Sequence, residues 1–371
     1  MTINLLPPGP GNPRNTEGDF VRLKDGRILF IYSRFSADGP ADSGPASLAA
    51  RYSRDEGRTW TDKDEPVVAN EGGMNVMSVS LLRMASGEIA LFYMRKNSML
   101  DCRPFMRVSK NEGRTWSKAQ TLYDGPDDDR DPSITQLKDG RLLCTFFVIG
   151  EGVHQIFSED LGQTWSAPGT ITATHYSSSP VRELSGGRLG LGLYDEKDDR
   201  ASGAFTYSDD VGRNWSQPID IDNAGQYLDA ETDVIDLKGG SLYSVHRGGR
   251  GAQMHWTLSQ DRGRTWGKSK PIGFIAHCPY LHRAAGDIIL LAYRKPGPGP
   301  WSGTGLSYSL DECKSWSEPL QIDSTIGAYP SMVNLKDGSV LIVYYEEGVG
   351  SSIRARRLRV SPQGVEWLRL R

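Results

Sequence analysis

The 371-residue sequence lacks any long hydrophobic run, and it also lacks an excess of positive charge. No segment approaches the roughly eighteen consecutive apolar residues that a membrane-spanning helix needs. The net charge of -3 and the pI near 6.1 provide no basic surface for nucleic acid or for an anionic membrane. We therefore expect neither a nucleic-acid partner nor a membrane partner.

The first residues, MTINLLPPGPGNPRN, lack the charged and apolar segments of a secretory leader. As written, the chain is expected to be cytoplasmic. Had a leader been removed, the protein would be secreted or periplasmic. The sequence carries no signal for the oligomeric state.

Cysteine is scarce and is not arranged for metal binding. The four cysteines show no CxxC or CxxH spacing, which argues against a zinc site and against a disulfide framework: Cys102, Cys144, Cys278 and Cys313. The acidic stretch DGPDDDRD lacks the spacing and the glutamate of a calcium loop, so a solvated acidic loop is favoured. We expect reduced, structural thiols and no metal or cofactor.

What the sequence does contain is a repeat. Six segments share a Ser-x-Asp/Asn pattern that ends in Trp, and we call them boxes: SRDEGRTW, SKNEGRTW, SEDLGQTW, SDDVGRNW, SQDRGRTW and SLDECKSW, which begin at Ser53, Ser109, Ser158, Ser208, Ser259 and Ser309. The spacing of 49 to 56 residues is typical of propeller blades. The Ser and Asp side chains can bond backbone amides in a turn that Gly closes with a positive φ. In the last box Cys313 replaces this Gly, which predicts a somewhat distorted turn.

A second recurring unit lies between the boxes. Seven segments alternate in polarity on both sides of a Gly-containing turn, such as FVRLKDGRILFIY and SMVNLKDGSVLIVYY. This pattern predicts an all-β chain of hairpins. One such hairpin and one box hairpin would form a four-stranded blade. We predict a single β-propeller domain over residues 1–371 with seven blades, the last completed by a terminal strand, and six blades as the alternative.

Three unrepeated stretches resemble the bacterial exo-sialidases, and the resemblance spans essentially the whole chain. In ETDVIDLKGGSLYSVHR a Glu opens a hairpin and an Arg closes it, at Glu231 and Arg247. The segment AYPSMVNLKDGSVLIVYYE presents Tyr329 where the family carries its nucleophile. In ADSGPASLAARYSRDEGRTW, Asp42 stands eleven residues before a box serine, close to the family's acid/base position.

The resemblance implies a defined chemistry. A Tyr nucleophile suits a substrate that already carries a carboxylate at the anomeric carbon, because an anionic nucleophile would be repelled. Glu231 would accept the proton of Tyr329, since a phenol alone is a poor nucleophile. Asp42 would protonate the leaving oxygen and later activate water. Arg247 would bind an anionic group of the sugar.

The chain departs from the family at two places. The family binds the substrate carboxylate with three arginines, and Thr16 and Trp301 stand at two of these positions. Arg14, Arg34 and Arg294 are near enough in sequence to compensate. This departure puts sialic acid itself in question as the substrate.

Each of these residues also has a structural interpretation. Tyr329 and Glu231 could simply line a solvated channel, and Arg247 could form a structural ion pair. Asp42 could only shape a turn, and Asp38 is the rival candidate for its acid/base role. Further candidates for substrate binding come from their positions near the starts of predicted inner strands or, for Trp301, from its aromatic ring: Glu17, Asp19, Asn75, Arg130, Asp131 and Trp301.

The leading functional hypothesis is a retaining exo-glycosidase of sialidase type that releases a terminal acidic sugar from a glycan. One alternative is a polysaccharide lyase that acts on uronates, with Tyr or one of His175, His246 and His282 as its base. Another is a glycan-binding propeller without catalytic activity. In all three cases the expected partner is a carbohydrate.

Overall fold

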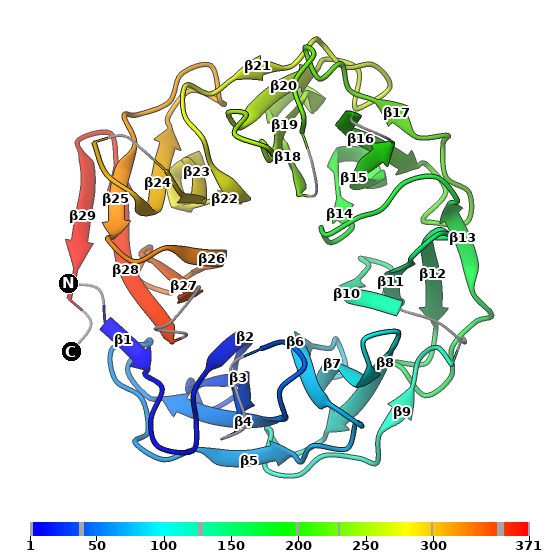
Figure 1. Cartoon of the computed structure of the whole chain (residues 1–371), viewed down its shortest axis with the longest axis vertical. Helices are drawn as coiled ribbons and strands as arrows, with labels where there is room; N and C mark the ends of the chain where they lie inside the picture. The colour runs from blue at the N-terminus through cyan, green and yellow to red at the C-terminus, as the bar shows by residue number, and fades with distance from the viewer. Residues whose placement is uncertain are drawn as a thin grey trace. The chain divides into compact units, whose positions relative to one another are not determined.

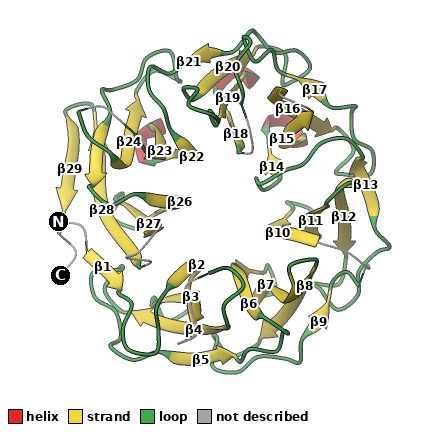
Figure 2. Ribbon diagram, viewed as in Figure 1, coloured by secondary structure: helices red, strands yellow, loops and turns green. Residues whose placement is uncertain are grey.

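Seven antiparallel sheets make up the secondary structure (Figures 1 and 2). The computed structural model describes residues 3–36, 41–124, 129–197, 200–228, 231–297, 300–346 and 352–369. Six sheets have four strands and one has five. The fold is an all-β propeller of seven blades, which confirms the fold predicted from the repeat.

The chain packs as two compact units. Unit 1 comprises residues 171–344 and 356–368. Unit 2 comprises residues 3–170 and 345–355, and it also takes in the last residues of the chain. The two units are described separately below.

Blades 1 to 3 belong mainly to unit 2, and their strands follow one another in chain order within each sheet. Blade 1 consists of β2 (Asn15–Arg22), β3 (Ile28–Phe35), β4 (Ala46–Ser53) and β5 (Glu65–Val68). Blade 2 consists of β6 (Asn75–Arg83), β7 (Ile89–Ser98), β8 (Asp101–Ser109) and β9 (Gln120–Thr121). Blade 3 consists of β10 (Asp129–Gln136), β11 (Leu142–Val148), β12 (Gly152–Ser158) and β13 (Gly169–Thr172).

Blades 4 to 6 belong to unit 1 and have the same strand order. Blade 4 consists of β14 (Arg182–Glu183), β15 (Leu189–Lys197), β16 (Arg200–Ser208) and β17 (Ile219–Asp220). Blade 5 consists of β18 (Thr232–Asp236), β19 (Leu242–His246), β20 (His255–Ser259) and β21 (Lys270–Pro271). Blade 6 consists of β22 (His277–Arg283), β23 (Ile289–Lys295), β24 (Gly303–Ser309) and β25 (Leu320–Asp323).

Within the described part of the chain, the helical segments are three short 3-10 turns, each between the first two strands of its blade: η1 (Ser185–Gly187), η2 (Lys238–Gly240) and η3 (Ala285–Asp287). Among the described residues, no helix has the length and apolar character needed to cross a membrane.

Both ends of the chain contribute to blade 7. Its sheet runs β26 (Gly327–Asn334), β27 (Val340–Glu346), β28 (Ile353–Ser361) and β1 (Ile3–Leu6), and β29 (Gly364–Leu368) pairs with β28. The pairing of β1 with β28 joins residues 3–6 to residues 353–355. A terminal strand therefore completes the blade that has no box, as predicted.

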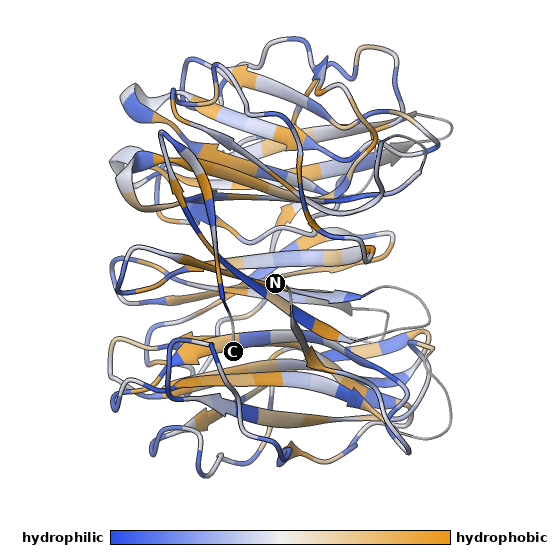
Figure 3. Cartoon of the chain, turned by 90° about the vertical axis from the view of Figure 1, so that its left-hand side faces the viewer, coloured by the Kyte–Doolittle hydropathy of each residue, from blue (hydrophilic) through white to orange (hydrophobic). Residues whose placement is uncertain are grey.

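The hydrophobic pattern explains why the middle strands are the most buried. Every residue of β11 and β23 is buried. In unit 1, one apolar cluster joins Tyr243 of blade 5 to Leu291 and Tyr293 of blade 6. Figure 3 shows hydrophobic stretches, in orange, along many of the strands.

Each box forms a hydrogen-bonded turn after the third strand of its blade. In blade 5, the Ser259 hydroxyl donates to Asp261 Oδ1 at 2.8 Å and accepts the amide of Gly263 at 2.7 Å. The Asp261 carboxylate accepts the amide and the hydroxyl of Thr265 at 2.8 and 2.6 Å. Gly263 has φ 89°, and a Cβ at this position would lie 2.3 Å from the ring of Phe205. The boxes are therefore structural turns.

The last box keeps this geometry without glycine. Cys313 adopts φ 62° and donates its amide to Ser309 Oγ at 2.9 Å. Asp311 accepts the amide and hydroxyl of Ser315 at 2.9 and 2.6 Å. The prediction of a distorted turn is wrong, because Cys313 adopts the left-handed conformation and its buried thiol packs in the core.

Replacing Asp261 with Ala should destabilise the protein by about 1 kcal/mol, because the Thr265 amide and the Ser259 hydroxyl lose their acceptor on a largely exposed turn. Urea unfolding measures this loss. Gln260→Ala in the same turn is the control, since Gln260 is exposed, and it should change stability by less than about 0.5 kcal/mol.

The effect of Asp261→Ala should depend on pH. Partial burial favours a higher pKa, but the hydrogen bonds from Thr265 and Ser259 lower the pKa of Asp261 to about 2. A carboxylate with a depressed pKa stabilises the fold above its unfolded pKa of about 4, and this contribution disappears as the pH falls through about 2. A difference between wild type and variant that stays constant from pH 5 to pH 2 would contradict this account.

Candidate active site

The carboxylate of Glu231 is the centre of the site in unit 1. It precedes β18, and its side chain is 7% exposed. Its Oε1 accepts Arg247 Nη1 at 2.8 Å and the Tyr329 hydroxyl at 3.2 Å. Its Oε2 accepts the backbone amide of Cys278 at 3.1 Å. Donors from blades 5, 6 and 7 thus converge on one buried carboxylate.

The blade 5 hairpin explains why Glu231 and Arg247 meet. Thr232 pairs with His246 at the open end of β18 and β19. The amide of Arg247 then donates to the carbonyl of Glu231 at 3.0 Å, so the two residues flank the end of the ladder. The predicted Glu and Arg at the two ends of one hairpin are therefore in direct contact.

Tyr329 is presented by a strained backbone. It lies near the start of β26 with φ 46°, a left-handed conformation that is uncommon for an aromatic residue. Its side chain is among the exposed large hydrophobic groups, at 52%. The ring is therefore open to solvent while its hydroxyl is held by Glu231. Backbone strain of this kind is concentrated at functional sites.

Cys278 contacts the same carboxylate through a second atom. Its φ is 51°, and its Sγ lies 3.8 Å from Glu231 Oε1. Burial, with a smaller contribution from the charge of Glu231, raises the pKa of the Cys278 thiol to about 12. The thiol therefore stays protonated and can act only as a weak donor to Glu231.

His277 lies near two arginines, Arg247 and Arg294. Arg294 Nη2 donates to His277 Nδ1 at 3.4 Å. Burial, followed by the charges of Arg247 and Arg294, lowers the pKa of His277 to about 4. Two guanidinium groups and a neutral imidazole thus adjoin the Glu231 and Tyr329 pair, and this arrangement suits an anionic group of a ligand.

Sequence reasoning missed His277 and Cys278, although a signal was present. The seven blades can be aligned by the turn between their first two strands. Nine positions before the last residue of that turn, the blades carry, in order, Glu17, Ser78, Asp131, Ser178, Glu231, Cys278 and Tyr329. Four of these have a left-handed φ, and three of the four lie at a register shift of the inner strand: Glu17, Ser78 and Cys278. Such bulges redirect side chains, so this alignment could have identified Cys278.

Unit 2 contains several other candidates, and one of them, Asp42, pairs with Arg14. Arg14 Nη1 lies 2.5 Å from Asp42 Oδ1, and the guanidinium stacks over Phe35 at 4.6 Å. The Asp42 side chain is 61% exposed. Asn75 holds this loop by donating to the carbonyls of Asp42 and Gly44, both at 2.8 Å.

Glu17 and Asp19 of blade 1 accept hydrogen bonds from blade 2. Glu17 Oε2 accepts the amide and hydroxyl of Ser78 at 3.2 and 3.1 Å. Asp19 accepts the amide of Leu81 at 2.7 Å, and burial raises the pKa of Asp19 to about 6. In unit 1, Asp233 likewise accepts the amide of Leu281 at 2.7 Å.

The other predicted residues have different surroundings. Arg34 pairs with Asp64 at 2.9 Å, and Thr16 is fully buried. Trp301 belongs to a cavity between blades 5 and 6. The side chains of Arg130 and Asp131, which lie in β10, and all of Asp38 fall outside the described residues.

The histidines of the lyase hypothesis lie in three separate environments. His175 pairs with Asp220 at 2.9 Å, and His282 bonds Asn334 at 3.1 Å. His246 is buried, and burial lowers its pKa to about 3. Within the described part of the chain, no three His, Cys, Asp or Glu side chains are grouped to hold a metal ion.

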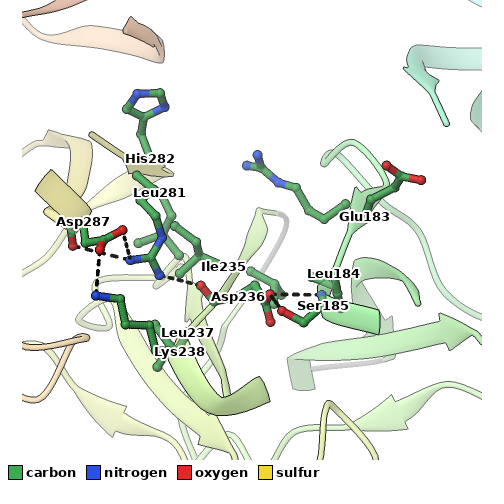
Figure 4. Close-up of a pocket in the computed structure, with 13 residues that line it drawn as sticks. Glu183, Leu184, Ser185, Ile235, Asp236, Leu237, Lys238, Leu281, His282 and Asp287 are labelled. Atoms are coloured by element: carbon green, nitrogen blue, oxygen red, sulfur yellow. Dashed lines mark hydrogen bonds and ion pairs between the residues drawn. The ribbon is translucent and has the colours of Figure 1, made fainter. Parts of the chain in front are cut away.

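A different cavity of about 400 Å³ lies at the far ends of the inner strands of blades 4 to 6 (Figure 4). Its charged side chains pair with protein groups: Lys238 with Asp287 at 2.7 Å, Arg283 with Glu312 at 2.8 Å, and Arg182 with Asp233 at 2.9 Å. Glu231 precedes β18, whereas this cavity is lined by the end of that strand. The two sites are therefore distinct.

Solved structures define the class of the fold. An unknown-function protein from Dyadobacter fermentans matches with a TM-score of 0.63 at 17% identity, over 97% of this chain and 99% of that one. A Hadza microbial sialidase matches with a TM-score of 0.53 at 19% identity, over 89% and 76%. The intramolecular trans-sialidase from Ruminococcus gnavus matches with a TM-score of 0.53 at 15% identity, over 98% of each chain. The fold is a sialidase-like propeller.

The family model for the BNR repeat-like domain matches residues 146–342, just over half of the chain, and the chain belongs to this family. A comparison with curated protein sequences gave no match.

Replacing Glu231 with Gln should destabilise the protein by roughly 2 kcal/mol, because the charge of Arg247 loses its partner and an amide group faces the Cys278 amide. Tyr329→Phe is the matched variant. It removes one hydrogen bond to Glu231 from a half-exposed ring and should cost about 1 kcal/mol. Equal losses in urea unfolding would mean that Glu231 does not anchor the site.

Replacing Arg294 with Gln should raise the pKa of His277 above about 4, because one of the two nearby positive charges is removed. The pKa should stay below the ordinary value of about 6.5, since burial and Arg247 remain. NMR titration of the imidazole measures the shift, with Arg283→Gln at the far end of β22 as the control. An unchanged pKa in Arg294→Gln would show that Arg294 does not act on His277.

Proposed function

We propose that the chain is a retaining exo-glycosidase of sialidase type, which releases a terminal acidic sugar from a glycan. The observation that carries the proposal is the contact between the Tyr329 hydroxyl and the buried Glu231 carboxylate, at 3.2 Å. The similar structures of a sialidase and a trans-sialidase support the same reaction class.

In the first step, the Tyr329 oxygen attacks the anomeric carbon and its proton passes to Glu231. The bond to the leaving oxygen breaks, and Asp42 gives that oxygen a proton. A neutral phenol can approach a sugar that carries a carboxylate beside the reacting carbon, whereas an anionic nucleophile would be repelled. The exposed ring of Tyr329 suits attack on a ligand that enters from solvent.

In the second step, water attacks the anomeric carbon and gives a proton to Asp42. The bond to Tyr329 breaks, and the phenol recovers its proton from Glu231. Two displacements at one carbon retain its configuration. The support for Asp42 is its position in the sequence and the exposure of its carboxylate to solvent, where it pairs with Arg14 in the absence of substrate.

Arg247 and Arg294 would bind the anionic group of the sugar. Arg247 contacts Glu231, and Arg294 contacts His277, so both guanidinium groups belong to the surroundings of Tyr329. Since Thr16 and Trp301 replace two arginines of the sialidases that the chain resembles, the acidic sugar need not be sialic acid.

The test is turnover of aryl glycosides of sialic acid and of related 2-keto sugar acids. Tyr329→Phe should lower kcat on the order of 10³-fold or more, because the nucleophilic oxygen is removed. Tyr308→Phe on β24 is the control and should keep wild-type activity, since this tyrosine packs in an apolar cluster. Full activity of Tyr329→Phe would contradict the mechanism.

Two further outcomes would replace the proposal. An unsaturated product that absorbs in the ultraviolet would indicate a lyase. Glycan binding without release of sugar from any substrate would indicate a binding propeller.

A further inference from the structure

A cavity at the junction of blades 5 and 6 contains Lys295. The arginines at the equivalent position of blades 1 and 2 are paired with carboxylates. The cavity measures about 650 Å³, a size typical of small-ligand sites. Its walls include Phe274, Lys295, Trp301, Ser307 and Trp316. All of these residues belong to unit 1.

The registers of three blades make the comparison between them direct. In blades 1, 2 and 6, a residue two positions before the box serine pairs across to the second strand: Arg51 with Phe30, Arg107 with Leu91, and Ser307 with Leu291. On that second strand, a tyrosine follows the paired residue by two positions: Tyr32, Tyr93 and Tyr293. A cationic residue follows it by four positions: Arg34, Arg95 and Lys295.

In blades 1 and 2, a carboxylate neutralises these groups. Asp64 accepts Arg34 at 2.9 Å and Arg51 at 2.6 Å, and it also bonds Tyr32. In blade 2, Glu71 accepts Arg107 at 2.8 Å and Arg95 at 3.1 Å, and it also bonds Tyr93. A cavity of about 470 Å³ borders the blade 1 cluster, but Asp64 supplies the negative charge there.

Blade 6 lacks this carboxylate among the described residues. Tyr293 bonds the Ser307 hydroxyl at 3.1 Å, and Lys295 Nζ donates to the carbonyl of Trp301 at 2.9 Å. Lys295 is only 6% exposed, and its ammonium lies 5.1 Å from the centre of the Trp301 ring. A buried ammonium with one neutral acceptor is costly, and an anion in the cavity would compensate it. Glu318, the acidic residue of the cavity lining, is exposed.

We propose that this cavity binds a sugar acid of the uronate class, with its carboxylate on Lys295 and its ring against Trp301. The ligand carboxylate takes the place that Asp64 and Glu71 fill in the other two blades. The indole of Trp301 supplies a flat apolar surface for the ring of a sugar. Arg294 precedes Lys295 on β23 and points to the opposite face of the strand, so this site is separate from the one at Glu231.

The test uses D-glucuronate as the probe and D-glucose as its neutral counterpart, with binding followed by NMR at the Trp301 indole. Glucuronate should bind at least tenfold more tightly than glucose. Lys295→Met should weaken glucuronate at least tenfold, whereas Lys295→Arg should stay within about threefold. The exposed Lys314→Met is the matched control and should not change the affinity.

Ser307→Arg provides a second variant that keeps the test decisive if Lys295→Met does not fold. It introduces the arginine that blades 1 and 2 carry at this position, and it should block the cavity and abolish binding. Arg247→Gln should leave glucuronate binding unchanged. The proposal is overturned if Lys295→Met or Ser307→Arg binds glucuronate like wild type, if glucose binds equally well, or if Arg247→Gln loses binding. None of these readouts requires glycosidase activity.

Discussion

The candidate site in unit 1 depends on one buried carboxylate. Glu231 would be costly to bury as an anion, and Arg247, Cys278 and Tyr329 offset that cost by donating hydrogen bonds to it. The three donors come from three successive blades. The same contacts that hold the blades in register therefore place a phenol hydroxyl on its base. Stability and chemistry cannot be separated at this residue.

The repeated and the unrepeated parts of the chain have different roles. The boxes satisfy their own hydrogen bonds within a turn, as Asp261 does with Ser259 and Thr265. At one aligned position near the start of the inner strands, the residue instead varies among Glu, Ser, Asp, Cys and Tyr, with a bulge in several of the blades. Because a bulge redirects one side chain without disturbing the sheet, the fold can vary chemistry there while it keeps its frame.

Much of the fold could be predicted from the sequence because its determinants are local. The box turns and the hairpins follow from patterns within about fifty residues, and the terminal strand of blade 7 was inferred by comparing seven hairpins with six boxes. The contact between Glu231 and Tyr329 spans 98 residues and was predicted from a family resemblance, not from local pattern. Local reasoning failed at Cys313, where a left-handed conformation was possible without glycine.

His277, Cys278 and Lys295 were missed for a common reason. Their importance comes from neighbours on other strands and blades: the Arg247 and Arg294 charges around His277, the carboxylate beside Cys278, and the missing carboxylate beside Lys295. A single sequence does not show such neighbours until strand register is known. Once the blades are aligned by their turns, the same residues stand out by comparison with their equivalents.

The central claim is that Tyr329, held by Glu231, forms a covalent bond with the sugar. Mass spectrometry of protein denatured during turnover of an aryl sialoside tests it most directly. The account predicts a glycosyl adduct on the peptide that contains Tyr329 and no adduct in Tyr329→Phe. Substrate turnover with the adduct on another peptide, or turnover that yields product of inverted configuration, would contradict it.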